Sequence, residues 1–258
     1  MAIPLISIVI PVFECHGDGA IYLRDLLDSL SVQTFKGFQI IISDQSAGNE
    51  LEELCKTYKL NIKYIKNLEG RGSCEANLNN AISHAEGTWI KVCLQDDYFL
   101  VPYALERVIS NIKPETKWIF NGCMHIQEKN KTNVFQAHVP QWVPGTALLR
   151  GYNLLGSPSL LMYKSDIKHK YFNPVLRYYM DTYFYYNLGL EVGPPVCIPE
   201  HLQIIRFREK SISSSQTTEK SKNEEHLYLD FKLANKPIPW DQLPLISKHL
   251  EDCGLSKT

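Results

Sequence analysis

The first 120 residues alternate between short apolar segments and segments with helical spacing, and this alternation constrains the fold most. Between the apolar segments, hydrophobic residues recur at i, i+3, i+4 and i+7, as at Leu23, Leu26, Leu27 and Leu30. The predicted strands cover 5–12, 38–43, 61–66, 89–94 and 118–120. Strands that alternate with helices form a largely parallel sheet with helices on both faces. The sequence therefore predicts a Rossmann-like α/β/α sandwich.

The second half of the chain is less regular. Residues 123–155 show no clear periodicity. Further along we expect a loop that leads into a strand over 156–163, an aromatic-rich segment over 178–188 and a strand over 203–207. After them we expect a mobile polar loop over 211–225 that leads into a helix, and helical pieces over 226–258.

Composition excludes several classes of protein. The net charge of −1 over 258 residues gives no electrostatic reason to expect a nucleic-acid partner. No apolar run approaches the roughly 20 residues that cross a bilayer, and the start of the chain does not look like a signal peptide. Seven scattered cysteines without a CxxC pair are typical of reduced thiols rather than of a disulfide framework or zinc site. We therefore expect a cytoplasmic protein.

Polar clusters follow the predicted strands at the points where they end. They are Phe13–Glu14, Asp44, Glu69–Gly72 and Asp96–Asp97. Ligands of parallel sheets collect beyond the carboxyl ends of the strands, so these clusters should meet at one edge. Adjacent carboxylates disfavour joint ionisation, and a bound cation or hydroxyl-rich ligand would relieve that conflict. The alternative is that Asp96 and Asp97 cap the helix near Pro102, but the convergence favours a site.

The order and spacing of these motifs resemble the family 2 glycosyltransferases, which have the GT-A fold. The resemblance is nearly continuous over residues 5–100 and thin beyond them, where it depends on Ser157-Pro158-Ser159 and Met180-Asp181. It implies one GT-A domain over 1–258, with a nucleotide-sugar-binding half (1–100), an acceptor-binding half (101–215) and a C-terminal helical tail (216–258). The matching motifs are SIVIPVFE at 7–14, LSVQT at 30–34, IISDQS at 41–46, GRGSCEAN at 70–77 and GTWIKVCLQDD at 87–97.

The resemblance assigns roles in binding a nucleotide-diphosphate sugar, with UDP as the default nucleotide. Asp44 would accept hydrogen bonds from the nucleobase, and Arg71 would reach the base or a phosphate. Asp96 would bind ribose or sugar hydroxyls, and Asp97 would hold Mn²⁺ or Mg²⁺ against the diphosphate. The remaining donor-site residues are Pro11, Val12, Phe13, Glu14, Gly70, Asn77, Gln95 and Arg208.

On the acceptor side, the resemblance makes Asp181 the general base of an inverting displacement at the anomeric carbon. Relatives supply this base from an acidic pair, whereas Met180 precedes Asp181 here. Aromatic surroundings would raise the pKa of Asp181, which suits proton abstraction. The carbohydrate acceptor is expected to contact Ser157, Tyr179 and Trp142. A lipid-linked acceptor would require peripheral contact with the membrane.

Two departures from the family pattern bear on the metal. Gln95 replaces one carboxylate of the usual Asp-x-Asp, and Arg208 stands near the position of a late metal-binding histidine. Together they imply a weaker metal site. A sharper hypothesis is that Arg206, Arg208 or Lys210 helps to neutralise the diphosphate from a loop that orders over the donor.

Several alternatives remain at this point. For single residues the alternatives are that Asp44 only caps a helix, that Arg71 is a solvated loop residue and that Asp181 points to solvent. For the whole chain the alternative is a non-catalytic relative that binds a nucleotide sugar or a glycan. A sugar-nucleotide pyrophosphorylase is a weaker alternative, because the residues after the first strand do not form its glycine-rich, basic loop.

Overall fold

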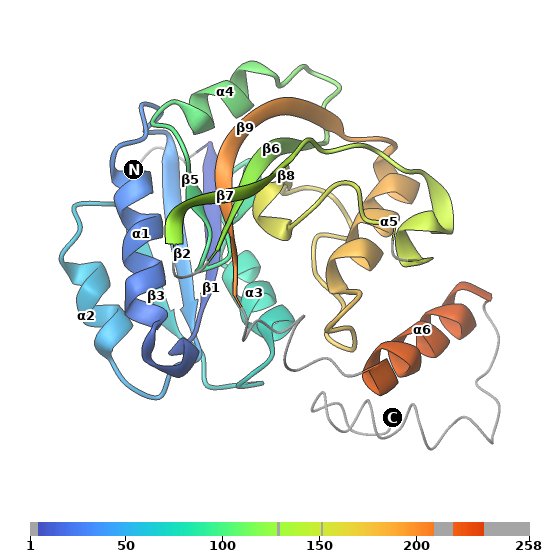
Figure 1. The fold of residues 1–258 in the computed structure, drawn as a ribbon, viewed down its shortest axis with the longest axis horizontal. Helices are drawn as coiled ribbons and strands as arrows, with labels where there is room; N and C mark the ends of the chain where they lie inside the picture. Colours follow the sequence, from blue (N-terminus) through green and yellow to red (C-terminus); the bar gives the residue numbers. More distant parts are fainter. Residues whose placement is uncertain (1–4, 128–129, 151, 209–218, 235–258) are drawn as a thin grey trace.

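A nine-stranded mixed sheet forms the centre of the computed structural model, which describes residues 5–127, 130–150, 152–208 and 219–234. The strand order is β3-β2-β1-β4-β8-β6-β9-β5, and β7 pairs with β6 (Figure 1). The strands are β1 (Ile6–Val12), β2 (Phe38–Asp44), β3 (Ile62–Lys66), β4 (Trp89–Val92), β5 (Tyr98–Phe99), β6 (Trp118–Gln127), β7 (Asn130–His138), β8 (Leu161–Lys164) and β9 (Val196–Phe207).

The predicted parallel part of the sheet is confirmed. β1 pairs in parallel with β2 on one side and with β4 on the other, and β3 extends the parallel ladder from β2. β6 and β9 run in this same direction, because β8 is antiparallel to both β4 and β6, and β9 is parallel to β6. The carboxyl ends of β1, β2, β3 and β4 therefore lie along one edge of the sheet.

The second half of the sheet contains elements that the sequence pattern did not predict. β7 forms a hairpin with β6, and the two-residue strand β5 pairs with β9. Strands β6 and β9 are also longer than expected, with 10 and 12 residues. Unlike β1, β2 and β4, which are buried throughout, β6 and β9 mix buried and partly exposed positions, so they lack the continuous apolar run that marks a buried strand.

Helices cover both faces of the sheet (Figure 1). Within β1, Ile8 and Ile10 face a core shared with α1, α2 and α4, whereas Val9 faces a second core shared with α3, α5 and α6. This division follows from the two-residue period of a strand. The helices are α1 (Gly19–Ser31), α2 (Glu50–Lys56), α3 (Cys74–Ser83), α4 (Ala104–Ser110), α5 (Met180–Val192) and α6 (Glu219–Ala234), with short 3-10 turns η1 (Cys15–Gly17), η2 (Gly145–Arg150) and η3 (Pro158–Leu160).

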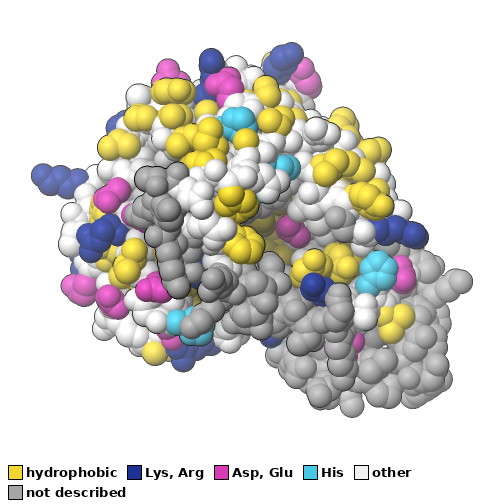
Figure 2. All heavy atoms as spheres, in the orientation of Figure 1, with side chains coloured by type: hydrophobic (Ala, Val, Ile, Leu, Met, Phe, Trp, Pro, Cys, Tyr) yellow, Lys and Arg dark blue, Asp and Glu magenta, His cyan; other side chains and the backbone are white. Residues whose placement is uncertain are grey.

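Of the expected C-terminal elements, the helix is confirmed over 226–234, but it begins earlier than expected. Helix α6 begins at Glu219, so residues 219–225 are helical rather than part of a polar loop. Residues 211–218 and 235–258 lie outside the described residues. No helix in the described part of the chain is long and apolar enough to cross a membrane. Figure 2 shows basic and acidic side chains interspersed over one face of the molecule.

The sheet depends on a close approach between Gly87 and β1. The amide of Gly87 donates to Ser7 Oγ at 2.8 Å, and Gln39 Nε2 donates to the same oxygen at 2.8 Å. A Cβ atom on Gly87 would lie 2.6 Å from the backbone nitrogen of Ser7, well inside van der Waals contact. Only glycine therefore fits at this position without a backbone shift.

We predict that Gly87→Ala lowers the free energy of unfolding by about 1–3 kcal/mol, the usual cost of overpacking. Urea-induced unfolding followed by circular dichroism measures the change. Gly48→Ala is the matched control, because a Cβ atom on Gly48 meets nothing within 4 Å. Equal unfolding midpoints for the two variants would contradict the steric argument.

Candidate active site

The polar clusters at the strand ends meet at one edge of the sheet, as predicted. Arg71 lies at the centre of this edge. Its Nε donates to the carbonyl oxygen of Gln45 at 3.0 Å, and its Nη2 forms an ion pair with Glu14. The guanidinium carbon lies 5.5 Å from the centre of the Phe13 ring. Arg71 is therefore held by segments from three strand ends and is not a freely solvated loop residue.

Gln45 fixes the loop that carries Arg71. Its Nε2 donates to the carbonyl oxygens of Glu69 and Gly70 at 2.9 Å each, and its Oε1 accepts from the amide of Gly72 at 3.1 Å. Gly70 and Gly72 adopt φ values of +60° and +90°, which favour glycine. Gln45 lies in the motif IISDQS at 41–46, but the sequence analysis did not predict it as a site residue.

Asp44 lies beneath this loop with no exposed surface. Its Oδ1 accepts from the amide of Ser46 at 2.7 Å, and its Oδ2 accepts from Tyr64 Oη at 2.5 Å and Lys66 Nζ at 2.7 Å. Burial alone would raise the pKa of Asp44, but these hydrogen bonds outweigh burial and lower it. Asp44 is therefore a charged residue in the floor of the edge. The residue before α2 is Asn49, so Asp44 does not cap that helix.

Two predicted donor-site residues form the frame behind this edge. Asn77 Nδ2 donates to the carbonyl oxygen of Val12 at 3.0 Å, and its Oδ1 accepts from Ser43 Oγ at 2.6 Å. Gln95 Oε1 accepts from the amide of Phe13 at 2.8 Å, while its Nε2 donates to the carbonyl oxygen of Gly19 at 2.7 Å. Both side chains are buried, so they shape the loop after β1.

Within the stretch that ends β1, only the last two residues reach the surface. Pro11 and Val12 are buried, whereas Phe13 and Glu14 are partly exposed. The loop that follows is tightly turned, because Cys15 and His16 adopt φ values of +46° and +58°. Non-glycine residues adopt such values rarely and at a cost in conformational energy. Phe13 and Glu14 are therefore the residues of this stretch that are exposed at the strand edge, whereas Pro11 and Val12 are not.

The adjacent carboxylates Asp96 and Asp97 have opposite surroundings. Asp97 is 3% exposed. Its Oδ2 accepts from Ser159 Oγ at 2.5 Å, and its Oδ1 accepts from the amide of Arg206 at 3.1 Å. Burial, followed by the charge of Asp96, raises the pKa of Asp97 to about 8. Asp96 instead forms an ion pair with Arg208, with 2.6 Å between Oδ2 and Nε.

The end of β9 supplies two arginines with different environments. Arg206 is buried; its Nη2 lies 2.7 Å from Asp25 Oδ2, and its guanidinium stacks 4.8 Å from the Tyr22 ring centre. Arg208 stacks on the same ring at 5.2 Å but points to Asp96. Burial opposes the charge of Arg208, but Asp96 raises the pKa of the guanidinium above its usual range. Lys210 lies outside the described residues.

A divalent cation held by Asp97 does not fit this arrangement. Both oxygens of Asp97 already accept hydrogen bonds from protein donors, and Asp96 is occupied by a guanidinium. In the part of the chain that the structure describes, no group of three or more His, Cys, Asp or Glu side chains is placed to hold a metal ion. Hard cations need several oxygen ligands, so the donor set is poor.

Asp181 lies in the first turn of α5, on the side of the sheet covered by that helix. Its Oδ2 accepts from Asn153 Nδ2 at 3.0 Å, and its Oδ1 accepts from the amide of Thr182 at 2.7 Å. Burial raises the pKa of Asp181 to about 6; the Thr182 amide lowers it, and the charge of Glu225 raises it. Asp181 is therefore held by two hydrogen bonds but stays partly exposed, with a raised pKa that suits accepting a proton near neutral pH.

The segment from Asn153 to Ser159 connects the two groups of carboxylates. At one end Asn153 donates to Asp181, and at the other end Ser159 donates to Asp97. Ser157, a predicted acceptor residue, lies between them and accepts from the amide of Ser159 at 3.3 Å. This short segment links the surroundings of Asp181 to those of Asp97.

The other two predicted acceptor residues have different outcomes. Tyr179 directly precedes α5, two residues before Asp181, and its ring lies 5.9 Å from that of His226 on α6. Trp142 packs edge-on against Trp118 with 5.3 Å between ring centres, and its ring also contacts Gly189. Gly189 lies about 12 Å along the helix from Asp181, at 1.5 Å per residue. Trp142 is therefore a packing residue away from the site, and the structure does not bring it to the acceptor side.

Lys91 lies next to the surroundings of Asp97, although the sequence analysis did not identify it as a site residue. Its ammonium group is buried inside β4 and donates to the carbonyl oxygen of Ser159 and to Gln203 Oε1, the latter at 2.8 Å. Burial lowers the pKa of Lys91 to about 8. Its sequence signal was a lysine inside an otherwise apolar strand. Lys91 thus supports Ser159, the partner of Asp97.

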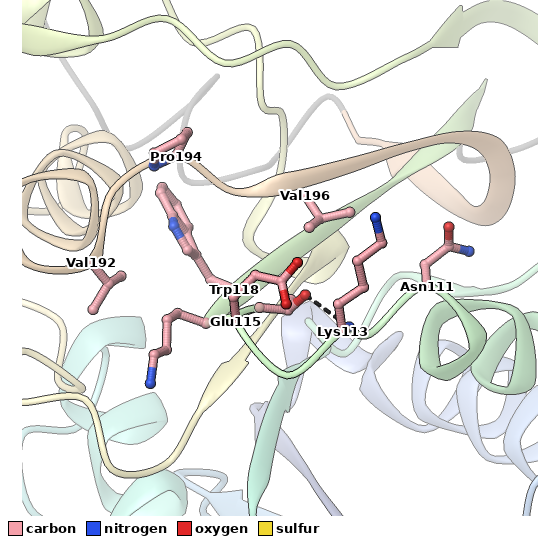
Figure 3. A pocket seen from close by; sticks show the side chains of 9 residues that line it. Asn111, Lys113, Glu115, Trp118, Val192, Pro194 and Val196 are labelled. Atoms are coloured by element: carbon pink, nitrogen blue, oxygen red, sulfur yellow. Dashed lines mark hydrogen bonds between the residues drawn. The ribbon is translucent and has the colours of Figure 1, made fainter.

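A pocket of about 300 Å³ lies at the opposite edge of the sheet (Figure 3). Trp118 and Val196, which line it, are the first residues of β6 and β9. Because both strands run in the direction of β1, this pocket is separated from the strand ends that carry Arg71 and Asp96. It contains none of the predicted site residues.

Known proteins match both the sequence and the fold. The model of the family described as "Glycosyl transferase family 2" matches residues 7–184. The GalNAc(5)-diNAcBac-PP-undecaprenol beta-1,3-glucosyltransferase of Campylobacter jejuni is 24% identical over 135 residues, which are 51% of this chain and 42% of that protein. The chain spans about a third or less of the length of the curated relatives that it matches first.

Solved structures share the GT-A fold. S. aureus TarS in complex with UDP-GlcNAc has a TM-score of 0.66 at 19% identity, covering 95% of this chain and 71% of that one. The mannosyltransferase PcManGT of Pyrobaculum calidifontis, in complex with GDP-Man and Mn²⁺, has a TM-score of 0.62 at 14% identity, covering 100% of this chain and 77% of that one. Because the family model matches residues 7–184, which is more than half of the chain, this chain belongs to glycosyl transferase family 2.

Proposed function

We propose that this chain transfers a sugar from a nucleotide-diphosphate sugar to a hydroxyl group of a glycan acceptor, with inversion at the anomeric carbon. The observation that carries the proposal is the segment from Asn153 to Ser159, which contacts Asp181 at one end and Asp97 at the other. It joins a candidate base to the strand edge where a donor would bind. UDP is the expected nucleotide, since TarS of similar fold is seen with UDP-GlcNAc.

The nucleotide would bind against Phe13, Glu14 and Arg71, where an aromatic ring, a carboxylate and a guanidinium meet. Asp44 closes the floor beneath them. The aromatic face suits stacking of a nucleobase, and the charged groups suit hydrogen bonds to the base, ribose or phosphate. Asp96 is the carboxylate of the edge best placed to meet ribose or sugar hydroxyls, because Asp97 is turned inward.

The reaction would be a single displacement. Asp181 removes the proton from the acceptor hydroxyl, whose oxygen forms a bond to the anomeric carbon. The bond from that carbon to the phosphate oxygen breaks, and the nucleoside diphosphate leaves with the bonding electron pair. Inversion follows, because attack and departure occur on opposite faces of the sugar.

We further propose that Arg208 supplies the positive charge that the leaving diphosphate needs. Its guanidinium already neutralises Asp96 at the strand edge, where the sequence suggested a cation. A guanidinium binds phosphate oxygens through two parallel hydrogen bonds and stays charged at any physiological pH. Stacking on Tyr22 holds it in place. Arg206 cannot serve equally, since it is buried against Asp25.

Asp181→Asn is predicted to lower the rate of sugar transfer by about 10²–10⁴-fold, because an amide cannot accept the proton. Release of nucleoside diphosphate in the presence of acceptor measures this rate, and isothermal titration with the donor should show unchanged affinity. Asp166→Asn, at an exposed loop position, is the control. Full activity of Asp181→Asn would exclude the base role, and donor binding without turnover in the unmodified chain would indicate a binding protein instead.

The pH dependence of the unmodified chain gives a second check on Asp181. A base acts in its deprotonated form, and the pKa of Asp181 lies near 6. We therefore expect kcat/KM to rise tenfold per pH unit below about pH 6 and to level off above it. An acid limb near pH 4, the ordinary range of an aspartate, would contradict a raised pKa for the base of the reaction.

Arg208→Ala is predicted to lower kcat by about 10²–10³-fold, the usual loss for one group that stabilises a developing charge. EDTA should leave the unmodified chain active, while Arg208→His should recover activity only with added Mn²⁺. Arg107→Ala, which removes an exposed ion pair with Glu200, is the control. Loss of wild-type activity in EDTA, together with normal donor affinity of Arg208→Ala, would overturn this assignment.

A further inference from the structure

Helix α6 places a buried carboxylate against the segment directly before α5, the helix that carries Asp181. Glu225 is 1% exposed. Its Oε1 accepts from the amide of Arg177 at 3.0 Å, and its Oε2 accepts from the amides of Tyr178 at 2.9 Å and Tyr179 at 3.0 Å. One side chain thus binds three consecutive backbone amides directly before α5.

These amides need a partner from outside the helix. The first turn of a helix has amide groups without intrahelical acceptors, and a side-chain oxygen just before the helix usually satisfies one of them. Tyr179 occupies that position in α5 and provides no side-chain hydrogen bond. Glu225 accepts from the amide of Tyr179, which is one of these groups, and from the amides of the two residues before it, although it lies 46 to 48 residues further along the chain. Its negative charge also interacts favourably with the positive end of the helix dipole.

We propose that Glu225 is a positioning residue for Asp181, so that α6 belongs to the catalytic apparatus. This inference rests on the base role of Asp181 given above. By fixing the backbone of Arg177, Tyr178 and Tyr179, Glu225 sets where α5 begins and hence where the Asp181 carboxylate points. Asp181 lies two residues after the last amide that Glu225 binds.

The charged groups around this junction come from three helices and the segment before α5. Glu225 raises the pKa of Asp181, while Asp181 in turn contributes to the raised pKa of Tyr185 on α5. Arg177 and Lys222 are the cations of this region; Lys222 Nζ lies 4.5 Å from the centre of the Tyr178 ring. Glu75 of α3 is a further buried carboxylate. Burial raises its pKa; among the smaller effects, the charge of Arg177 lowers it and the charge of Glu225 raises it.

The sign of the electrostatic effect follows from these neighbours. A negative charge near Asp181 disfavours its ionised form and raises its pKa. Neutralising Glu225 while keeping its shape should therefore lower the pKa of Asp181 and move the acid limb of kcat/KM to lower pH. A residue with a purely structural role would change the fraction of folded protein without moving that limb.

Glu225→Gln is the decisive variant, because it removes the charge and keeps only one of the two accepting oxygens, while its NH₂ group would face a backbone amide that also donates. We expect kcat to fall by about 10- to 100-fold, as misplacement of a reacting group by about 1 Å can cost. The KM for the donor should stay unchanged, and the acid limb should lie below that of the unmodified chain. Glu225→Asp, which keeps the charge on a shorter side chain, should keep the acid limb in place. Asp230→Asn, exposed on the same helix, is the control.

The outcomes separate this inference from the proposed function. If Asp181→Asn is inactive but Glu225→Gln keeps the kcat and acid limb of the unmodified chain, Glu225 does not position the base, and the proposed function stands. If Asp181→Asn is fully active, the base role itself fails. Donor affinity and circular dichroism report folding of each variant. Should Glu225→Gln not fold, Glu225→Asp decides alone, and an unchanged kcat there would overturn the positioning role.

Discussion

The burial of Asp97 is the constraint on which the rest of the site depends. A carboxylate removed from water must be hydrogen-bonded, or its desolvation is too costly. Asp97 meets this need with Ser159 and the backbone of Arg206, which come from η3 and β9. Lys91, buried in the strand that leads to Asp97, holds the carbonyl oxygen of Ser159. The end of β4, η3 and β9 are thereby joined at one carboxylate.

The inward turn of Asp97 decides what its neighbour can do. Two adjacent carboxylates repel each other when both are ionised. Here this repulsion is reduced in two ways. Burial and the charge of Asp96 raise the pKa of Asp97 to about 8, which favours its neutral form, and Arg208 neutralises Asp96. The register of β9 links both effects, since the amide of Arg206 binds Asp97 two residues before Arg208 reaches Asp96. The positive charge and the buried carboxylate are thus parts of one arrangement.

The parallel half of the fold could be predicted because its signals are local. Each strand and helix between residues 5 and 112 shows its own period, and the rule for strand ends then places Glu14, Arg71 and Asp96 on one edge. Helix boundaries were less accurate, as α2 ends at Lys56 although the apolar spacing continues to Tyr58. The family resemblance covered the same residues, so both lines of reasoning became weaker beyond residue 100.

The remaining features depend on contacts between distant residues. Strand β7, with the sequence NKTNVFQAH, is mostly polar and becomes a strand only because β6 offers it an edge. Whether Asp96 or Asp97 faces the ligand is decided by Ser159 and Arg206, 62 and 109 residues away from Asp97. Trp142 was expected near the acceptor, but it packs against Trp118 and therefore lies away from Asp181. No local pattern contains such information.

The division of the chain into a regular and an irregular half has a functional counterpart. The regular half builds a rigid edge in which Arg71, Glu14 and Asp44 receive their conformations from neighbouring loops. The groups proposed for the chemical step receive theirs from later segments, Arg208 from β9 and Asp181 from the junction of α5 with α6. Substitutions in the first hundred residues should therefore act mainly on donor affinity. Those in the Asn153–Ser159 segment, β9 and α6 should act mainly on kcat, because they move the reacting groups without removing the nucleotide site.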